Sequence, residues 1–379
     1  MTWFIDKLSM HQEYPEGGLK LIGKHGVLRY DLATGDRIAD TVNSLPLEGS
    51  YSSVLTIRSN GSSVSVTGNP SRFNRLDNLF GFERLDDCVA VYNQILLSLD
   101  LPPFTKSTRV SFLQSADGTK AQSVSDGAII RSLDWTRNWN VGQGNELAFL
   151  RGLASQTIGR GLLPHLYSNG YTVDWRSNKS QYQGRGSTYR YDKAYLKAQD
   201  LLTHRAKRLR YANQEDIDYY DRVIQYCQDH GIVREEQSKK APWLKKHDTL
   251  AHYGRCDEAD FLPYLNDIHS AIQRLEVQDM TYETIAEQLL EQGICKSTQA
   301  ANSTESYYLK WLHGTDLDRS KSQYHVHRNR LLRLGIDISI PHDISRQSPQ
   351  IKLGEVISVT PALMPHWYRQ PSVRSLRAA

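Results

Sequence analysis

The first half of the chain is dominated by segments with the character of β-strands. Residues 49–58 and 62–67 alternate hydrophobic and polar side chains with a period of two on either side of Asn60-Gly61. An Asn-Gly pair supplies the positive φ angles that a tight hairpin turn needs. Further strands are expected at residues 4–8, 128–136, 171–175 and 187–191. The pattern therefore predicts a β-rich N-terminal half.

Helical spacing of hydrophobic residues interrupts this half twice and then dominates the rest of the chain. The early helices are expected at residues 85–101 and 145–154, and the later ones at 215–230, 258–276, 281–292 and 303–313. Residues 231–236 are a candidate for one further strand. Residues 281–311 resemble a helix-turn-helix, although a plain helical hairpin with a glycine turn is an equally good interpretation.

These patterns suggest an α+β protein with three regions. We expect a domain at residues 1–210 that carries any chemistry, a mostly helical domain at residues 211–345, and a flexible tail at residues 346–379 that is rich in Pro, Ser and Arg.

Composition narrows the class of protein. The chain of 379 residues is 39% hydrophobic and 23% charged, and it has no apolar run near the roughly 18 residues of a membrane span. The N-terminus has an acid at Asp6 and does not look like a signal peptide. The four cysteines have no metal-binding spacing and fit a reducing cytoplasm. We expect a soluble cytoplasmic protein with no membrane association.

The net charge of +4 permits nucleic-acid binding without requiring it. Basic residues are concentrated at 205–210 and 239–247, and again between residues 176 and 197. Each block could equally be an ordinary solvated surface.

A repeated Tyr-x-Lys pair is the strongest chemical signal. Tyr191 precedes Lys193 and Tyr195 precedes Lys197, four residues apart. A phenol with a pKa of about 10 is a poor nucleophile at neutral pH, but a neighbouring cation favours the phenolate. We expect Tyr191 near a strand end, Tyr195 in the first turn of the next helix, and both on one side. The alternative is that both tyrosines pack against the sheet and the lysines are solvated.

A divalent cation would need carboxylates near these tyrosines. Asp134 is the best candidate, because an acid inside the apolar segment 128–136 is costly unless it meets a cation. Salt bridges to Arg131 or Arg137 are the alternative. Glu236 and Asp6 are further candidates for the metal site.

His325 and His327 flank a hydrophobic residue, as histidines that share a metal on a strand do. The following residues 328–335 have helical character, so local packing or a phosphate contact is the favoured interpretation of this pair.

Several segments resemble the replication initiators of filamentous bacteriophages, the gene II and gene X protein family. They are an Ile-Asp strand at residues 4–8, the Pro and Asn-Leu-Phe-Gly pattern within residues 68–81, Arg131-Ser-Leu-Asp134, Ala194-Tyr-Leu-Lys197 with Asp200, Val233-Arg-Glu-Glu236, and Gly-Ile-Asp-Ile within residues 334–339. Tyr191-Asp-Lys193 fits a variant of the tyrosine motif, so the choice between the two tyrosines stays open.

The resemblance implies a site-specific endonuclease dependent on Mg²⁺ or Mn²⁺, with an antiparallel-sheet catalytic domain related to the rolling-circle nickases. Such an enzyme nicks double-stranded replicative-form phage DNA at the plus-strand origin through a 5′-phosphotyrosine and later joins the displaced single strand into a circle. Host helicase and polymerase are the implied partners, and the host cytoplasm is the implied location.

DNA contacts are expected from arginines near the proposed site, which are Arg72, Arg75, Arg131, Arg185 and Arg190. The alternative function is a DNA-binding regulator of replication or transcription that catalyses nothing. It would depend on the helix-turn-helix-like segment and the basic blocks.

Overall fold

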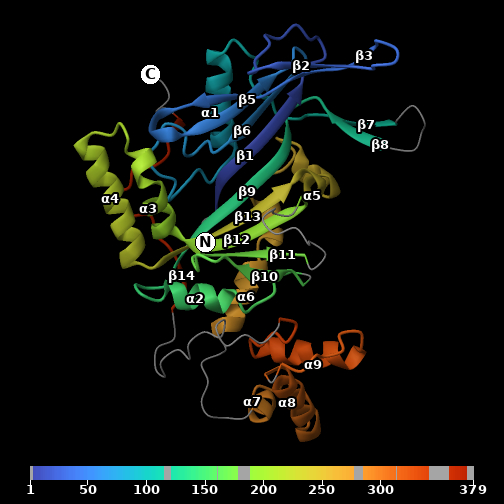
Figure 1. Ribbon diagram of the computed structural model, residues 1–379, viewed down its shortest axis with the longest axis vertical. Coiled ribbons are helices and arrows are strands. Elements are labelled where there is room, and N and C mark those ends of the chain that lie inside the picture. Colours follow the sequence, from blue (N-terminus) through green and yellow to red (C-terminus); the bar gives the residue numbers. More distant parts are fainter. Residues whose placement is uncertain are drawn as a thin grey trace.

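The computed structural model describes residues 3–114, 121–159, 161–177, 188–276, 285–312, 314–340 and 358–373. Over these residues the chain has the expected α+β fold, with a large antiparallel sheet followed by a helical C-terminal region (Figure 1).

Ten strands of the described chain form the large sheet, and all neighbouring strands are antiparallel. In order across the sheet they are β10 (Leu163–Leu166), β11 (Thr172–Arg176), β12 (Arg190–Leu196), β13 (Ile232–Lys240), β9 (Ile129–Asn140), β1 (Phe4–Glu13), β6 (Ser63–Gly68), β5 (Val54–Ser59) and β4 (Leu45–Glu48), with β14 (Thr360–Pro361) paired to β9. The predicted hairpin around Asn60-Gly61 is the β5–β6 pair, and Gly61 has a φ of 94°.

Strand β13 lies in the middle of this sheet, between β12 and β9. The sheet domain therefore continues well past residue 210, where the sequence pattern suggested a boundary. That boundary followed the change to helical spacing, but the helices after residue 210 return the chain to the sheet and do not leave it.

Two smaller hairpins extend from one end of the sheet (Figure 1). They are β2 (Gly26–Tyr30) with β3 (Arg37–Val42), and β7 (Val110–Gln114) with β8 (Ala121–Ser125).

One face of the large sheet is covered by helices along its whole width. These helices are α1 (Leu85–Ser98), α2 (Glu146–Leu153), α5 (Ala241–Lys246) and α6 (Asp267–Glu276), with the short 3-10 helices η2 (Asp248–Ala251) and η3 (Ala259–Tyr264) beside α5. Leu8 and Trp135 pack in the core under α1 and α5, and Val233 packs under α2 and α6. Burying each such side chain contributes roughly 1.5–3 kcal/mol.

The opposite face is covered at one end only. Helices α3 (Lys197–Arg208) and α4 (Gln214–Asp229), the loop 69–82 and residues 358–373 form this cover, and the 3-10 helix η1 (Ser50–Ser52) adjoins α3. Beyond the cover the strands carry partly exposed polar side chains, such as Thr56, Ser65 and Thr67. The alternation seen in the sequence thus separates a dry face from an open one.

Part of the expected flexible tail is packed against the sheet. Residues 358–373 pair with β9 through β14 and then cross α4, and buried Tyr368 donates its hydroxyl hydrogen to Asp77 Oδ1 at 2.6 Å. Composition alone suggested a loose segment, but Trp367 and Tyr368 bury enough aromatic surface to hold it. Residues 346–357 and 374–379 lie outside the described chain.

Three helices form a separate core at the C-terminal end (Figure 1). They are α7 (Ile285–Glu291), α8 (Thr298–Leu312) and α9 (Ser322–Arg333), and they correspond to the expected helical segments. Arg328 of α9 binds Asp337, whose carboxylate also accepts a hydrogen bond from the hydroxyl of Thr157 in the sheet domain. Within the described residues, no helix is long and apolar enough to span a membrane.

We expect Tyr368→Phe to lower the free energy of unfolding by about 1–3 kcal/mol, because a buried carboxylate loses a donor. Asp77 is 1% exposed, and its pKa is lowered because Arg75 and Tyr368 outweigh the effect of burial. Urea denaturation measures the change. Tyr211→Phe is the control, since Tyr211 is 88% exposed. Equal stability of the two variants would contradict the assigned role of the Tyr368 hydroxyl.

Candidate active site

Both candidate tyrosines lie on strand β12. Helix α3 begins only at Lys197, so the expectation that Tyr195 lies in the first helical turn is wrong. Residues two apart on a strand project to the same side. Tyr191, Lys193 and Tyr195 therefore share the open face of the sheet, where all three are partly exposed.

Tyr195 is bonded to a carboxylate of the neighbouring strand. Its hydroxyl donates to Glu236 Oε1 at 2.5 Å, and the Lys193 ammonium lies 2.7 Å from Glu236 Oε2. The nitrogen atoms of Lys193 and Lys197 lie 5.0 Å and 5.8 Å from the centre of the Tyr195 ring. One phenol is thus held between a carboxylate and two ammonium groups.

Tyr191 leans toward the other neighbouring strand. Its hydroxyl donates to Asp174 Oδ2 of β11 at 2.8 Å and lies 3.1 Å from the Tyr167 hydroxyl. Arg176 pairs with the same Asp174 oxygen at 2.7 Å. The two tyrosines therefore belong to separate polar clusters on one strand.

The pKa of each phenol is raised, which corrects the expectation that the lysines favour a phenolate. Burial raises the pKa of Tyr195, and the charge of Glu236 raises it further. Burial also raises the pKa of Tyr191, together with its hydrogen bonds to Tyr167 and Asp174. In the protein alone both phenols keep their protons, and each proton already points at a carboxylate that can accept it.

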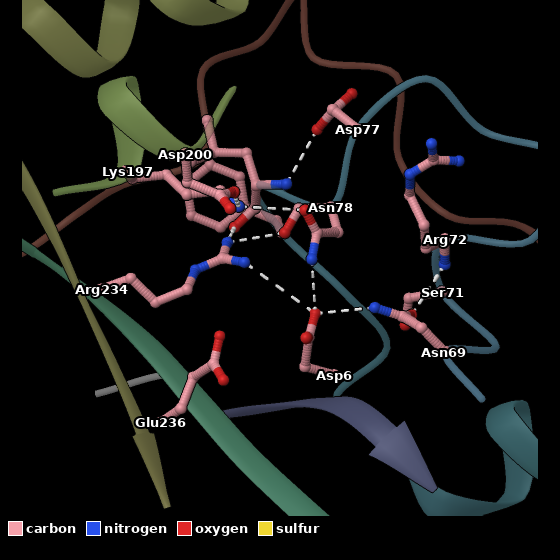
Figure 2. A network of polar contacts seen from close by, with 12 residues as sticks. Asp6, Asn69, Ser71, Arg72, Asp77, Asn78, Lys197, Asp200, Arg234 and Glu236 are labelled. Atoms are coloured by element: carbon pink, nitrogen blue, oxygen red, sulfur yellow. Dashed lines mark hydrogen bonds and ion pairs between the residues drawn. The ribbon is translucent and has the colours of Figure 1, made fainter. Parts of the chain in front are cut away.

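Asp6 is held by amide side chains from the loop 69–82 (Figure 2). It lies at an irregularity in β1, and its Oδ1 accepts hydrogen bonds from Asn69 Nδ2 and Asn78 Nδ2, both at 2.8 Å. Arg234 of β13 lies 3.9 Å from the same oxygen. These contacts fix one carboxylate oxygen of Asp6 in place.

Lys197 is fully buried under the cover of the open face. Its ammonium donates to Asn78 Oδ1 at 3.0 Å and pairs with Asp200 at 2.7 Å (Figure 2). Burial and Arg234 lower the pKa of Lys197, whereas Lys197 outweighs burial to lower the pKa of Asp200. Lys197 therefore joins α3 to the loop that holds Asp6.

The three expected metal ligands come from adjacent strands. Asp6 lies on β1, Asp134 on β9 and Glu236 on β13. Among the described residues, Asp134 has no arginine as an ion-pair partner. Burial raises its pKa, Lys240 and Ser238 oppose this effect, and the charges of Glu236 and Asp6 add to it. The three carboxylates thus act on one another electrostatically.

Lys193 offsets this concentration of negative charge. Burial lowers its pKa, but Glu236, Asp6 and Asp134 together raise it. In the described chain no three histidine, cysteine or acidic side chains are close enough together to hold a metal ion. Asp134 Oδ1 is buried and has no hydrogen-bond partner there, so one hard oxygen ligand remains unused. This donor set suits Mg²⁺ chemically, provided that the cation replaces the Lys193 ammonium.

Most of the arginines expected to bind DNA are engaged inside the protein. Arg72 and Arg75 donate to backbone carbonyl groups, and Arg190 pairs with two carboxylates. Arg131 is exposed, and Arg185 lies outside the described residues. Arg131 is therefore the one of these that the structure leaves accessible.

The histidine pair does not form a metal site. Both residues lie on α9, where His327 is buried against Thr304 at 2.9 Å and stacks on Tyr307, while His325 is exposed. Side chains two apart on a helix point in different directions.

Comparison with known proteins identifies the family. Residues 289–374 match the family model for the C-terminal part of the phage replication-associated protein. The chain is 38% identical over 327 residues to the replication-associated protein of Escherichia phage If1, which covers 84% of this chain and 98% of that protein. The chain belongs to this replication-associated protein family. No solved structure matches it.

Membership of this family confirms the resemblance to phage replication proteins that the sequence motifs indicated. Sequence reasoning nevertheless missed several polar residues of this site, namely Asn69, Asn78, Asp174 and Arg234. Asn69, Asn78 and Arg234 lie inside the segments that carried the resemblance. Asp174 had no signal, because an acid near the end of a short strand is common.

We expect Glu236→Gln to lower the free energy of unfolding at pH 7 by about 2 kcal/mol, since Lys193 loses its partner charge and Tyr195 its acceptor. Lys193 and Arg234 outweigh burial and lower the pKa of Glu236 in the folded protein. Its contribution is therefore complete above the unfolded pKa of about 4.3 and is lost as pH falls below that value.

Urea denaturation between pH 7 and pH 4 measures both effects. The variant should lose less stability than the unmodified protein on acidification, because it has no charge at this position to protonate. Glu83→Gln, at an exposed glutamate, is the control. Parallel pH profiles for the unmodified protein and Glu236→Gln would contradict this assignment.

Proposed function

We propose that this protein initiates phage DNA replication by nicking one strand of the duplex replicative form at a specific origin and later joining the displaced strand. Tyr195 is the nucleophile. The observation that carries this proposal is the Tyr195 hydroxyl placed on Glu236, beside Lys193 and two further acids, on the open face of the sheet. The family relationship supports the role in replication.

The chemistry follows from the proton on Tyr195. Glu236 accepts this proton as the phenol oxygen attacks the phosphorus, and the bond from phosphorus to the 3′ oxygen breaks. The 3′ oxygen leaves with a proton from Lys193 or water, and the 5′-phosphate stays on the tyrosine. Attack by a 3′-hydroxyl on this phosphotyrosine reverses the step and joins a strand without ATP. Joining therefore requires the same residues as nicking.

Tyr195 is preferred to Tyr191 because of the direction in which each side chain leans. The Tyr195 hydroxyl points to β13, where Glu236 interacts with Asp6 and Asp134. Tyr191 points away from those acids to Asp174, which Arg176 neutralises. A phosphate beside Tyr195 would therefore meet the cations and the proton acceptor together.

A divalent cation, Mg²⁺ or Mn²⁺, would be held by Asp6, Asp134 and Glu236. When bound, it would neutralise charge on the phosphate under attack. Lys193 would then leave Glu236 Oε2 and face the DNA, because its side chain is 30% exposed. Asn69 and Asn78 would keep Asp6 oriented throughout.

The substrates in this proposal are duplex replicative-form DNA and the displaced single strand, in the cytoplasm of the bacterial host. Host helicase and polymerase would act with the protein. The helices α7, α8 and α9 would add DNA contacts outside the nicking site. A regulator that binds DNA without cutting it is the rival function, and covalent attachment separates the two.

We expect Tyr195→Phe to form no covalent adduct with supercoiled plasmid DNA that carries the phage origin, because phenylalanine has no oxygen to attack phosphorus. The unmodified protein should convert the plasmid to open circles with Mg²⁺ and remain bound to DNA in denaturing gels. Tyr191→Phe, the matched control, should keep the adduct.

Three results would reject parts of this proposal. An adduct on Tyr191 alone would make Tyr191 the nucleophile. Nicking without an adduct would indicate hydrolysis by activated water. A mobility shift without nicking by the unmodified protein would favour the regulator.

We expect Asp134→Asn to weaken Mn²⁺ binding by about 10–100-fold, since a charged ligand becomes a neutral one. Lys193→Met should strengthen Mn²⁺ binding, because it removes the competing ammonium. Electron paramagnetic resonance of Mn²⁺ measures both affinities without DNA. Asp174→Asn, a buried carboxylate of the other cluster, should change little. Equal Mn²⁺ affinity in all variants would exclude this metal site, and chelation with EDTA should stop nicking only if the site is real.

A further inference from the structure

A second group of cations lies on the open face of the sheet, away from the tyrosines. Arg58 of β5, Ser65 of β6 and His11 of β1 are direct neighbours across the strands. Arg131 of β9 lies at a register shift beside them, where Ser9 pairs with Ser132 and Met10 with Ile130. Arg131 is exposed and Arg58 partly exposed. Three side chains that can carry positive charge thus meet on one surface.

These charges are poorly compensated by the protein. Neither Arg58 nor Arg131 forms a hydrogen bond or ion pair with a residue in the described parts of the chain. Burial and the charge of Arg58 lower the pKa of Arg131. Burial and Arg131 also lower the pKa of His11, although Glu13 opposes them. Like charges held close together cost energy, and a bound anion converts that cost into attraction.

Glu13 does not cancel this group. Its Oε1 lies 2.6 Å from His11 Nε2, and Ser65 Oγ lies 2.9 Å from His11 Nδ1. Both ring nitrogens of His11 are therefore engaged, and Glu13 is turned to the histidine. The two guanidinium groups remain directed at whatever lies on the open face.

Polar side chains connect these arginines to the candidate active site. Ser132 pairs with Ser9 on one side and with Lys240 on the other, and the next polar position of β9 is Asp134, which pairs with Lys7. At about 3.3 Å per residue, Arg131 lies roughly 10 Å along β9 from Asp134. A strand of DNA held at Tyr195 reaches this distance within a few nucleotides.

We propose that Arg58 and Arg131 bind phosphates of the single DNA strand that extends from the nicked position across the open face, with Lys7, Lys240 and the neighbouring hydroxyl groups between. This inference depends on the proposed function for the position of the nick. A single strand fits because the surface is a row of separate cations and hydroxyl donors on an open, flat face, which follows an extended backbone.

The test uses Tyr195→Phe as the background, so that binding is measured without covalent attachment. A fluorescent single-stranded oligonucleotide of mixed sequence is titrated with this protein and with the protein that also carries Arg58→Ala and Arg131→Ala. We expect affinity to fall by about tenfold or more, and the slope of log affinity against log salt to fall by about 1.4, from roughly 0.7 for each lost single-strand phosphate contact.

Arg151→Ala with Arg210→Ala, in the same background, is the matched control. Both residues are exposed, and their removal changes the net charge equally, but they lie on α2 and just after α3. The control should bind DNA nearly as well as the background protein. The stability of the Arg58 and Arg131 variant should not fall, because repulsion between the two guanidinium groups is removed.

Oligonucleotides with single neutral methylphosphonate linkages locate the contact. One or two linkages should weaken binding of the background protein, and the same linkages should have little further effect on the Arg58 and Arg131 variant, because the contact is already lost. Equal losses in the test and control variants, or a methylphosphonate effect that the double substitution leaves unchanged, would overturn the proposal.

The outcomes separate this inference from the proposed function. If the unmodified protein forms an adduct with origin DNA but the arginine variant binds like the control, the surface assignment fails and the nickase stands. If no adduct forms but the arginine variant loses affinity, the surface stands as a DNA site without the nicking chemistry. Stronger loss for duplex than for single-stranded DNA would overturn the assignment to a single strand.

Discussion

The central strand β13 carries charged side chains on both faces, and each of these charges needs a partner because the strand is buried. On the covered face Glu235 pairs with Arg137 at 2.7 Å. On the other face Glu236 pairs with Lys193 of the strand beside it. Leaving any of these charges unpaired would cost several kcal/mol. The order of strands around β13 is thus tied to the chemistry that the strand carries.

This constraint also explains why the open face is covered at one end only. Arg234 and Lys197 are fully buried, so the loop 69–82 and helix α3 must supply their partners. Residues 358–373 then hold that loop through Tyr368 and Asp77, next to Asn78. The end of the chain therefore supports the amide that orients Asp6, although it lies far from Asp6 in sequence. The rest of the face stays open because its side chains are polar and need no cover.

The sequence predicted local features well and long-range pairing poorly. The hairpin at Asn60-Gly61 and the helix 85–101 depend on neighbouring residues, and both are present. The carboxylates Asp6, Asp134 and Glu236 were chosen one by one for their chemistry, and the sheet brings them to adjacent strands. The assignment of Arg72 to DNA came from its place in a motif, which does not reveal that backbone carbonyl groups engage its guanidinium. Such contacts between distant segments leave no periodic signal.

The position of Tyr195 was mistaken for a related reason. The change to helical spacing begins at Ala194, but β12 keeps its hydrogen bonds to β11 and β13 through Tyr195. Pairing on both sides outweighs local helix propensity. This difference matters for the chemistry, because a strand directs Tyr195 at the carboxylate of the next strand. In the proposed mechanism the phenol therefore keeps its proton until phosphate and cation arrive, and we infer that the nucleophile forms only on bound DNA.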